Sequence, residues 1–137
     1  MGRVEGKIAL VTGAARGLGF AMATKLAEEG ALVVLSDVME DVVSASAKSL
    51  CDQGYKADYV VGDVSKYDDV QAMVKSIIDK YDHIDILVNN AGINRDAMMH
   101  KMTVDQWDKV IAIDLTGVFY CTQAVAIHMR ERDYGRI

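Results

Sequence analysis

The 137 residues are 51% hydrophobic and 26% charged, which is the size and composition of one globular domain that buries a core of its own. The formal net charge of -5 leaves no basic surface for a phosphate backbone, so we expect no nucleic-acid partner. Two isolated cysteines, Cys51 and Cys121, argue against a metal site and a disulfide framework, and strand-length apolar runs without a leader argue against a membrane span or secretion, so we expect a cytoplasmic protein.

Strands and helices are predicted to alternate along the chain. The four apolar runs rich in β-branched residues that we predict as strands are 7–12, 31–37, 57–63 and 84–90. Because these runs lack an in-out alternation, they are typical of strands covered on both faces of a parallel sheet. The segments between them have helical length. The order β-α-β-α-β-α-β-α predicts right-handed crossovers and an α/β fold with a doubly wound parallel sheet of the Rossmann type.

The second and third helices are predicted from their ends and their apolar periodicity. The second spans 39–53, and Gly54 follows it as a left-handed terminator. The third spans 68–80 with its apolar residues on one stripe, and Ser65 with Asp68 three positions later predicts a capping box at its start.

The first strand runs into the glycine-rich turn "TGAARGLG", 12–19, which opens a helix that extends to Glu29. Gly13 permits a tight turn, Gly17 lets the backbone approach a pyrophosphate, and Gly19 lets the helix pack closely on the strand. The N-terminus of the helix then offers unpaired N–H groups to an anion. The spacing G-x-x-x-G-x-G differs from G-x-G-x-x-G and lacks the Lys-Ser/Thr of a P-loop, so glycines that serve only turn geometry and packing remain an alternative.

Asp37 ends the second strand, 18 residues after Gly19, where a carboxylate can accept a hydrogen bond from a ribose 2′-OH. This favours NAD, because a 2′-phosphate would meet a like charge at a cost on the order of a few kcal/mol. Arg16 favours NADP instead, since its guanidinium can pair with that phosphate, but between the two we expect NAD. Asp37 as the N-cap of the next helix is a further interpretation, and it is compatible with the first.

Three motifs at the ends of three predicted strands carry a family resemblance: "TGAARGLG", "GDVS" at 62–65 and "NNAG" at 89–92. With these in order, the chain resembles the short-chain dehydrogenase/reductase family over about 7–137. The resemblance implies a nicotinamide dinucleotide across the strand ends, at the switch point between strands one and four. The cofactor-binding residues that we predict are Gly13, Ala15, Arg16, Gly17, Leu18, Gly19, Asp37, Val38, Asp63, Val64, Asn90, Ala91 and Gly92. Among them, the resemblance gives the adenine to Asp63 and Val64.

The stretch "GINRDAMMHKMTVDQWDKVIAIDLTGVF" is similar to the 3-oxoacyl thioester reductases of that family, which act on acyl carrier protein or coenzyme A substrates. The similarity implies an NAD(P)-dependent oxidoreductase that reduces a 3-oxoacyl thioester or a related ketone. Those reductases usually prefer NADPH, whereas Asp37 favours NAD. Met98, Met99 and Met102 suit an acyl channel, although apolar residues after a strand are more often core.

The last helix is predicted to be long, from Val104 to Arg132, with a capping box of Thr103 and Gln106 at its start. Asp114 falls within the apolar stripe of this helix, which we draw on an ideal helix from Trp107 onward and where a charge is costly without a partner. The family has an Asn of its catalytic tetrad at this position, on a kinked helix, so Asp114 is our catalytic candidate. The alternative is that the kink turns Asp114 to solvent or to a neighbouring donor.

The last residues of the sequence bear on the fifth strand of the fold and on the family's other catalytic residues. The residues 135–137 resemble the beginning of a fifth strand, so we expect a sheet truncated after about four strands, with 1–137 as the dinucleotide-binding portion of one domain. The family's catalytic Ser, Tyr and Lys have no match, because no Tyr is followed by Lys four residues later. A catalytically inactive fragment that binds nucleotide or self-associates through the open edge of strand four is therefore an alternative to an active oxidoreductase, and we expect a homo-oligomer.

Overall fold

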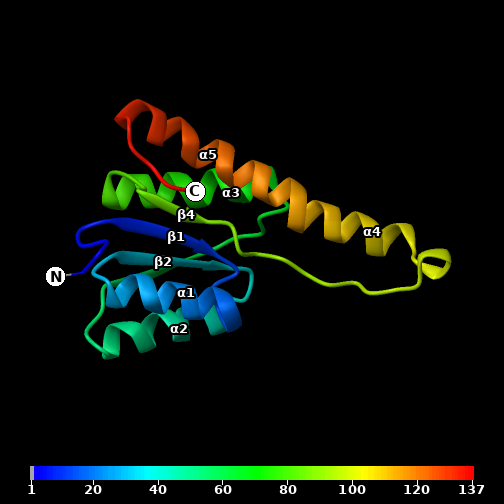
Figure 1. Ribbon diagram of the computed structural model, residues 1–137, viewed down its shortest axis with the longest axis horizontal. Coiled ribbons are helices and arrows are strands. Elements are labelled where there is room, and N and C mark those ends of the chain that lie inside the picture. The colour runs from blue at the N-terminus through cyan, green and yellow to red at the C-terminus, as the bar shows by residue number, and fades with distance from the viewer. Residues whose placement is uncertain (1) are drawn as a thin grey trace.

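The computed structural model describes residues 2–137 and contains one parallel sheet of four strands in the order β3-β2-β1-β4 (Figure 1). The strands are β1 (Ile8–Thr12), β2 (Leu32–Asp37), β3 (Ala57–Val61) and β4 (Ile86–Val88). All three neighbouring pairs are parallel. The predicted α/β fold with a Rossmann-type parallel sheet is confirmed, and the strand order reverses between β1 and β4, as expected.

Helices cover both faces of the sheet. They are α1 (Gly17–Glu28), α2 (Glu40–Asp52), α3 (Tyr67–Tyr81), α4 (Val104–Val110) and α5 (Gly117–Arg132), with a 3₁₀ turn η1 (Met99–Lys101) before α4 and a π-helical segment η2 (Ile111–Thr116) between α4 and α5. Figure 1 shows α1 and α2 on one face and α3 and α5 on the other, while α4 and the segment before it extend past the end of the sheet.

The core has two layers, one on each face of the sheet. Successive residues of β1 belong to opposite layers: Val11 packs with the residues of α1 and α2, and Leu10 packs with those of α3 and α5. Both side chains are buried, and burial of each stabilises the fold by about 1.5–3 kcal/mol. This double coverage explains why the strands are apolar without alternation.

All four predicted strands are shorter in the structure, the first two by one residue each, the third by two and the fourth by four. β3 ends at Val61, because the N–H of Asp63 leaves the sheet and donates to the carboxylate of Asp69 at 2.9 Å. β4 has three residues only, because beyond Val88 the N–H groups of Asn90 and Ala91 donate to the side chain of Thr12 and not to a strand. The residues that follow β3 and β4 in these runs, 62–63 and 89–90, form turns at the pocket described below.

Asp85 precedes β4 and holds three parts of the fold together at the end of the sheet away from that pocket. Its buried carboxylate accepts from the N–H of Ile8 at 2.9 Å and pairs with Arg132 and with Nε2 of His83, each at 3.1 Å. Burial raises the pKa of Asp85, but these partners outweigh burial and hold the pKa below its usual value of 3.8. The carboxylate is therefore ionised in the folded protein.

The capping box predicted for α3 is wrong. α3 begins at Tyr67 with Lys66 as its N-cap, so Ser65 lies one residue too early to cap it. The hydroxyl of Ser65 donates instead to Oδ1 of Asp63 at 2.6 Å. The left-handed terminator of α2 is confirmed, since Gly54 has φ of +91°.

The long helix is confirmed from Val104 to Arg132, and its capping box is present in both directions: Gln106 N–H donates to Thr103 Oγ1 at 3.1 Å, and Thr103 N–H donates to Gln106 Oε1 at 2.9 Å. By length and composition alone this stretch suffices to cross a membrane. Its second half is nevertheless packed as a core helix, because Val125 is fully buried on the α3 side of the sheet.

The last residues extend the sheet, as predicted. Arg136 lies parallel to Ile86, with its N–H donating to Asp85 O at 3.0 Å and its carbonyl accepting from Leu87 N–H at 2.9 Å. Part of the edge of β4 that we expected to be open is therefore covered by the chain itself.

Candidate functional site

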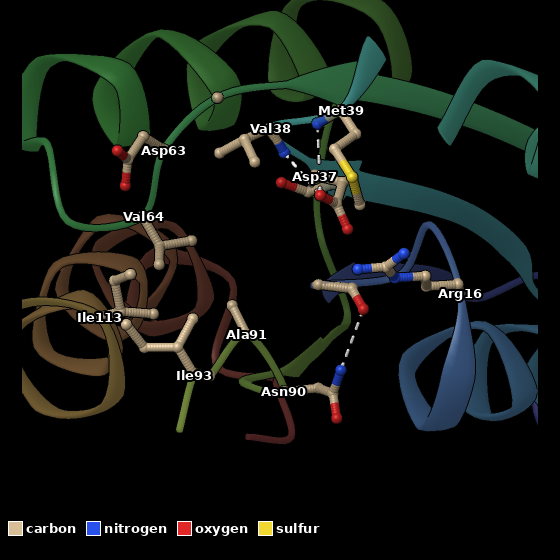
Figure 2. A pocket seen from close by; sticks show the side chains of 14 residues that line it. Arg16, Asp37, Val38, Met39, Asp63, Val64, Asn90, Ala91, Ile93 and Ile113 are labelled. Carbon is tan, nitrogen blue, oxygen red and sulfur yellow. Dashed lines mark hydrogen bonds between the residues drawn. The ribbon is translucent and has the colours of Figure 1, made fainter. Parts of the chain in front are cut away.

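A pocket of about 420 Å³ opens at the carboxyl ends of the four strands (Figure 2). Nine of the predicted cofactor residues line it: Gly13, Arg16, Asp37, Val38, Asp63, Val64, Asn90, Ala91 and Gly92. The other four, Ala15, Gly17, Leu18 and Gly19, belong to the same glycine loop and the first turn of α1 but are not part of the lining. The pocket spans the point where the strand order reverses, which is where ligands bind in open α/β sheets.

The three glycines of the loop have different local roles. Gly13 turns the chain with φ of +61°, and a Cβ on it would lie 2.8 Å from Ala91 Cα. A Cβ on Gly19 would lie 2.2 Å from Gly13 O, so Gly19 permits close packing of helix and turn. Around Gly17, by contrast, no atom of residues 2–137 lies within 4 Å of the Cβ position, apart from its chain neighbours and the nearby backbone of its own helix. A ligand can therefore approach the backbone at Gly17.

The N-terminus of α1 is unsatisfied. Arg16 is its N-cap residue, and among the described residues no side chain caps it and no acidic residue lies in its first turn. The first N–H groups of a helix have no partner within the helix, and together with the helix dipole they favour an anion. These are the features of a phosphate-binding helix terminus.

Asp37 holds the end of β2 against the glycine loop. Its Oδ2 accepts from Ala15 N–H at 3.1 Å, and its Oδ1 accepts from the N–H groups of Val38 and Met39 at 2.8 and 3.3 Å. The N-cap of α2 is Met39, so the interpretation of Asp37 as that N-cap is wrong. Since a carboxylate offers about four acceptor positions, three N–H groups leave one for a ligand hydroxyl. Figure 2 shows Asp37 and Arg16 on the same side of the pocket.

Thr12 joins the two central motifs and was not among the predicted site residues. Its buried Oγ1 accepts from the N–H groups of Asn90 and Ala91, each at 3.0 Å. Asn90 Nδ2 donates in return to the carbonyls of Thr12 and Gly13 at 3.1 Å. The signal that identifies Thr12 from sequence is a hydroxyl at the end of an otherwise apolar strand.

The opposite wall consists of Asp63, Val64 and the helix behind them. The Asp63 carboxylate accepts from the N–H and the hydroxyl of Ser65, which fixes its turn. Gly117 lets the helix approach Val64 closely, because a Cβ on Gly117 would lie 2.7 Å from Val64 Cγ2. Ile113 of η2 also lines this wall, as Figure 2 shows, and no sequence pattern had singled it out.

Asp114 lies outside the main pocket. Its Oδ1 accepts from Ile93 N–H at 2.9 Å, and its exposed side chain lines a second pocket of about 230 Å³ together with Trp107 and Met102. The helix thus turns Asp114 toward solvent and a neighbouring donor, as the alternative expected, while its catalytic role stays a prediction. The π-helical segment carries this residue out of the predicted apolar stripe, and the stripe itself fails at Trp107, which is 55% exposed.

The sequence matches a model of the family described as short chain dehydrogenase over residues 7–137. It is 40% identical over 134 residues to the subunit BbsD of (2S)-[(R)-hydroxy(phenyl)methyl]succinyl-CoA dehydrogenase from Thauera aromatica, covering 98% of this chain and 54% of that relative. It is also 40% identical over 135 residues to the 3-oxoacyl-[acyl-carrier-protein] reductase FabG of Thermotoga maritima, covering 98% and 55%. The chain spans about half the length of the curated relatives it matches.

Solved structures agree with these relatives. A gluconate 5-dehydrogenase from Burkholderia cenocepacia, in complex with NADP and tartrate, superposes with a TM-score of 0.93 at 41% identity and covers 97% of this chain and 52% of its own. A short chain dehydrogenase from Mycobacterium smegmatis superposes with a TM-score of 0.92 at 35% identity, covering 96% and 55%. The fold, the glycine loop before α1 and the family match together lead to one conclusion: this chain belongs to the short-chain dehydrogenase family.

Proposed function

We propose that residues 1–137 form the dinucleotide-binding portion of an NAD(P)-dependent oxidoreductase that interconverts a carbonyl and an alcohol. One observation carries the proposal: the uncapped N-terminus of α1 and the carboxylate of Asp37 flank the same pocket at the switch point of the sheet. When bound, the dinucleotide supplies or accepts the hydride. The chain's own residues bind and orient it.

The proposed binding residues follow the geometry of the pocket. The first turn of α1, from Gly17, faces the pyrophosphate with unpaired N–H groups, and Asp37 accepts from the adenosine ribose. Asp63 and Val64 form the opposite wall and contact the adenine. Asn90 contributes to binding without touching the ligand, because its side chain holds the turn after β1 against the turn after β4.

We propose NAD as the preferred form of the cofactor, with NADP bound more weakly. The carboxylate of Asp37 is held by three N–H groups, so it cannot swing away from an incoming 2′-phosphate without losing them. The resulting repulsion is on the order of a few kcal/mol at an effective dielectric near 20. Arg16 lines the same pocket, and its guanidinium offsets part of this repulsion.

Calorimetric titration of the 137-residue chain with NAD⁺ and with NADP⁺ tests both the site and the preference. We expect NAD⁺ to bind at least about tenfold more tightly, and Asp37→Ser to reduce or remove this difference. Equal or tighter binding of NADP⁺ by the unchanged chain contradicts the preference. Binding of neither nucleotide at millimolar concentration contradicts the proposed function.

For the substrate we propose a 3-oxoacyl thioester or a related ketone. The supporting observations are the 40% identity to a 3-oxoacyl-[acyl-carrier-protein] reductase and to a subunit of a succinyl-CoA-type dehydrogenase. Met98 and Met99 are 65% and 81% exposed, so the residues after β4 offer apolar surface beside the second pocket rather than core packing. Oxidation of NADH on addition of acetoacetyl-CoA, measured with the whole protein, tests this substrate class.

For the 137 residues alone, nucleotide binding without turnover is the second candidate. The observation that favours it is the missing Tyr-x-x-x-Lys pair, since reduction of a carbonyl needs a proton donor beside the hydride donor. We expect the isolated chain to bind NAD⁺ and to leave NADH unoxidised when acetoacetyl-CoA is present. Measurable NADH oxidation contradicts this candidate.

We also propose that a second copy of the chain covers the apolar side of the long helix. Large apolar side chains that are more than half exposed recur there at intervals of three, four and eight residues: Val104, Trp107, Leu115, Phe119 and Ile127. Exposed apolar surface of this kind suits the self-complementary contact of a symmetric dimer. Sedimentation should give a dimer that Phe119→Asp converts to a monomer. A monomer before substitution contradicts the proposal.

The cytoplasm is the compartment that we propose for the protein. Both Cys51 and Cys121 are free thiols in the structure, and a reducing compartment keeps them so.

A further inference from the structure

Ala15 is buried in the glycine loop, and both of its backbone polar groups are bonded to other elements. Its N–H donates to Asp37 Oδ2 at the end of β2, at 3.1 Å. Its carbonyl accepts from the hydroxyl of Ser46 on α2, at 2.5 Å. The preceding residue is held as well, because Ala14 N–H donates to Ser36 O at 3.0 Å. The loop before α1 is thus fastened by β2 on one side and by α2 on the other.

The bond from Ser46 bears directly on the phosphate-binding end of α1. The Ala15 carbonyl belongs to the peptide that leads into Arg16, the N-cap residue of α1. In a trans peptide the C=O and the N–H point in opposite directions. Once the Ala15 carbonyl is directed at α2, the Arg16 N–H must point away from α2. Ser46 therefore orients the backbone that leads into the first turn of α1, where the free N–H groups lie.

The other serines of α2 show that this bond is a specific feature of Ser46. The hydroxyl of Ser44 donates to Asp41 O at 3.2 Å, and the hydroxyl of Ser49 donates to Ser46 O at 2.7 Å. Both are bonds to a carbonyl three residues earlier in the same helix, which is the usual bond of a serine within a helix. Ser46 alone among the three reaches across to the glycine loop.

We propose that Ser46 is a positioning residue for the pyrophosphate of the dinucleotide, acting through the Ala15 carbonyl. The inference rests on the proposed dinucleotide function. Without the hydroxyl, the partly buried carbonyl of Ala15 loses its protein donor, and the Ala15–Arg16 peptide is free to rotate toward solvent. The N–H groups of the first turn then meet the anion with less favourable geometry, while Asp37 and the adenine wall keep their places.

The test compares Ser46→Ala with Ser49→Ala, which removes a hydroxyl of the same helix that bonds within the helix. ADP-ribose and adenosine are titrated into each chain and followed by NMR. We expect Ser46→Ala to bind ADP-ribose about fivefold more weakly, the usual effect of one hydrogen bond, and to bind adenosine as before. Ser49→Ala should leave both affinities unchanged, and Ser46→Thr, which keeps the hydroxyl, should restore the binding of ADP-ribose.

The inference is overturned if Ser46→Ala binds ADP-ribose as tightly as the unchanged chain, or if it loses adenosine to the same extent. It is also overturned if Ser49→Ala shows the same loss. Should Ser46→Ala fail to fold by circular dichroism, Ser46→Cys replaces it in the same comparison, because a thiol has similar size and is a weak donor. If the unchanged chain binds neither ADP-ribose nor NAD⁺, the proposed function itself is wrong, which separates the two failures.

Discussion

Replacing Thr12 by Val removes one hydroxyl from the centre of the site, which accepts from two N–H groups and donates to Val88 O at 3.4 Å. Valine has nearly the same shape as threonine, and Thr12 is 1% exposed, so the main change at this buried position is the loss of the hydroxyl. The substitution deprives two N–H groups, those of Asn90 and Ala91, of the oxygen that both use at 3.0 Å. A donor left without a partner in a buried place costs about 1–3 kcal/mol. Because both groups are only partly buried beside the pocket, the lower end of this range applies to each, and together they predict a loss of about 2 kcal/mol of unfolding free energy.

This loss is a large share of the total, because a domain has about 5–15 kcal/mol in all. Urea unfolding followed by circular dichroism measures it, with Thr12→Ser as the variant that keeps the acceptor. Thr24→Val is a matched control: the Thr24 hydroxyl donates to Phe20 O within α1, so its removal leaves no donor unpaired. We expect Thr24→Val to cost less than about 1 kcal/mol. A cost below about 1 kcal/mol for Thr12→Val would refute the idea that this hydroxyl holds the two motifs together.

Three further predictions concern other parts of the fold. Gly117→Ala places a Cβ 2.7 Å from Val64 Cγ2, so it should lower the free energy of unfolding by about 1–3 kcal/mol. It should also weaken NAD⁺ binding, because Val64 is moved into the pocket. An unchanged melting temperature and unchanged binding would contradict this. The pKa of Asp85 is held below 3.8, so its ion pairs stabilise the fold above pH 3.8 and are lost as the pH falls through the lowered pKa. The stability of Asp85→Asn should therefore depend less on pH below about 4 than that of the unchanged chain. An unchanged acid-unfolding profile would contradict this role of Asp85. Burial raises the pKa of the Cys121 thiol to about 11, so Ellman's reagent at pH 8 should modify only the exposed Cys51 in the native chain and both thiols after unfolding, and rapid modification of two thiols in the native chain would show that Cys121 is accessible.

Features that arise from neighbouring residues were predictable from the sequence. The strands follow from apolar runs, and the alternation with helices leads to the parallel sheet without further information. The capping box of Thr103 and Gln106 was found because a box is a local pattern of four residues. The same local pattern failed at Ser65, where a carboxylate two residues earlier takes the hydroxyl.

Features that depend on the packed structure were not predictable from these patterns. The π-helical segment Ile111–Thr116 shifts the faces of the long helix, so the stripe drawn on an ideal helix misplaced Asp114 and Trp107. The bond from Ser46 to Ala15 joins residues 31 apart, and no periodicity points to it. Of the candidate site, the glycine loop, Asp37 and the "NNAG" motif were predicted from sequence; Thr12 left a signal that was not used, and Ile113 required the structure.

The central claim is that the loop between β1 and α1 and the end of β2 hold a dinucleotide. Titration of the isotope-labelled chain with NAD⁺, followed residue by residue by NMR, tests it most directly. We expect saturable shifts of the amides of Arg16, Gly17 and Leu18 and of those after Asp37, with the amides around Asp85 at the opposite end of the sheet unchanged. Saturable shifts confined to other parts of the chain, or no shifts at millimolar NAD⁺, would contradict the claim.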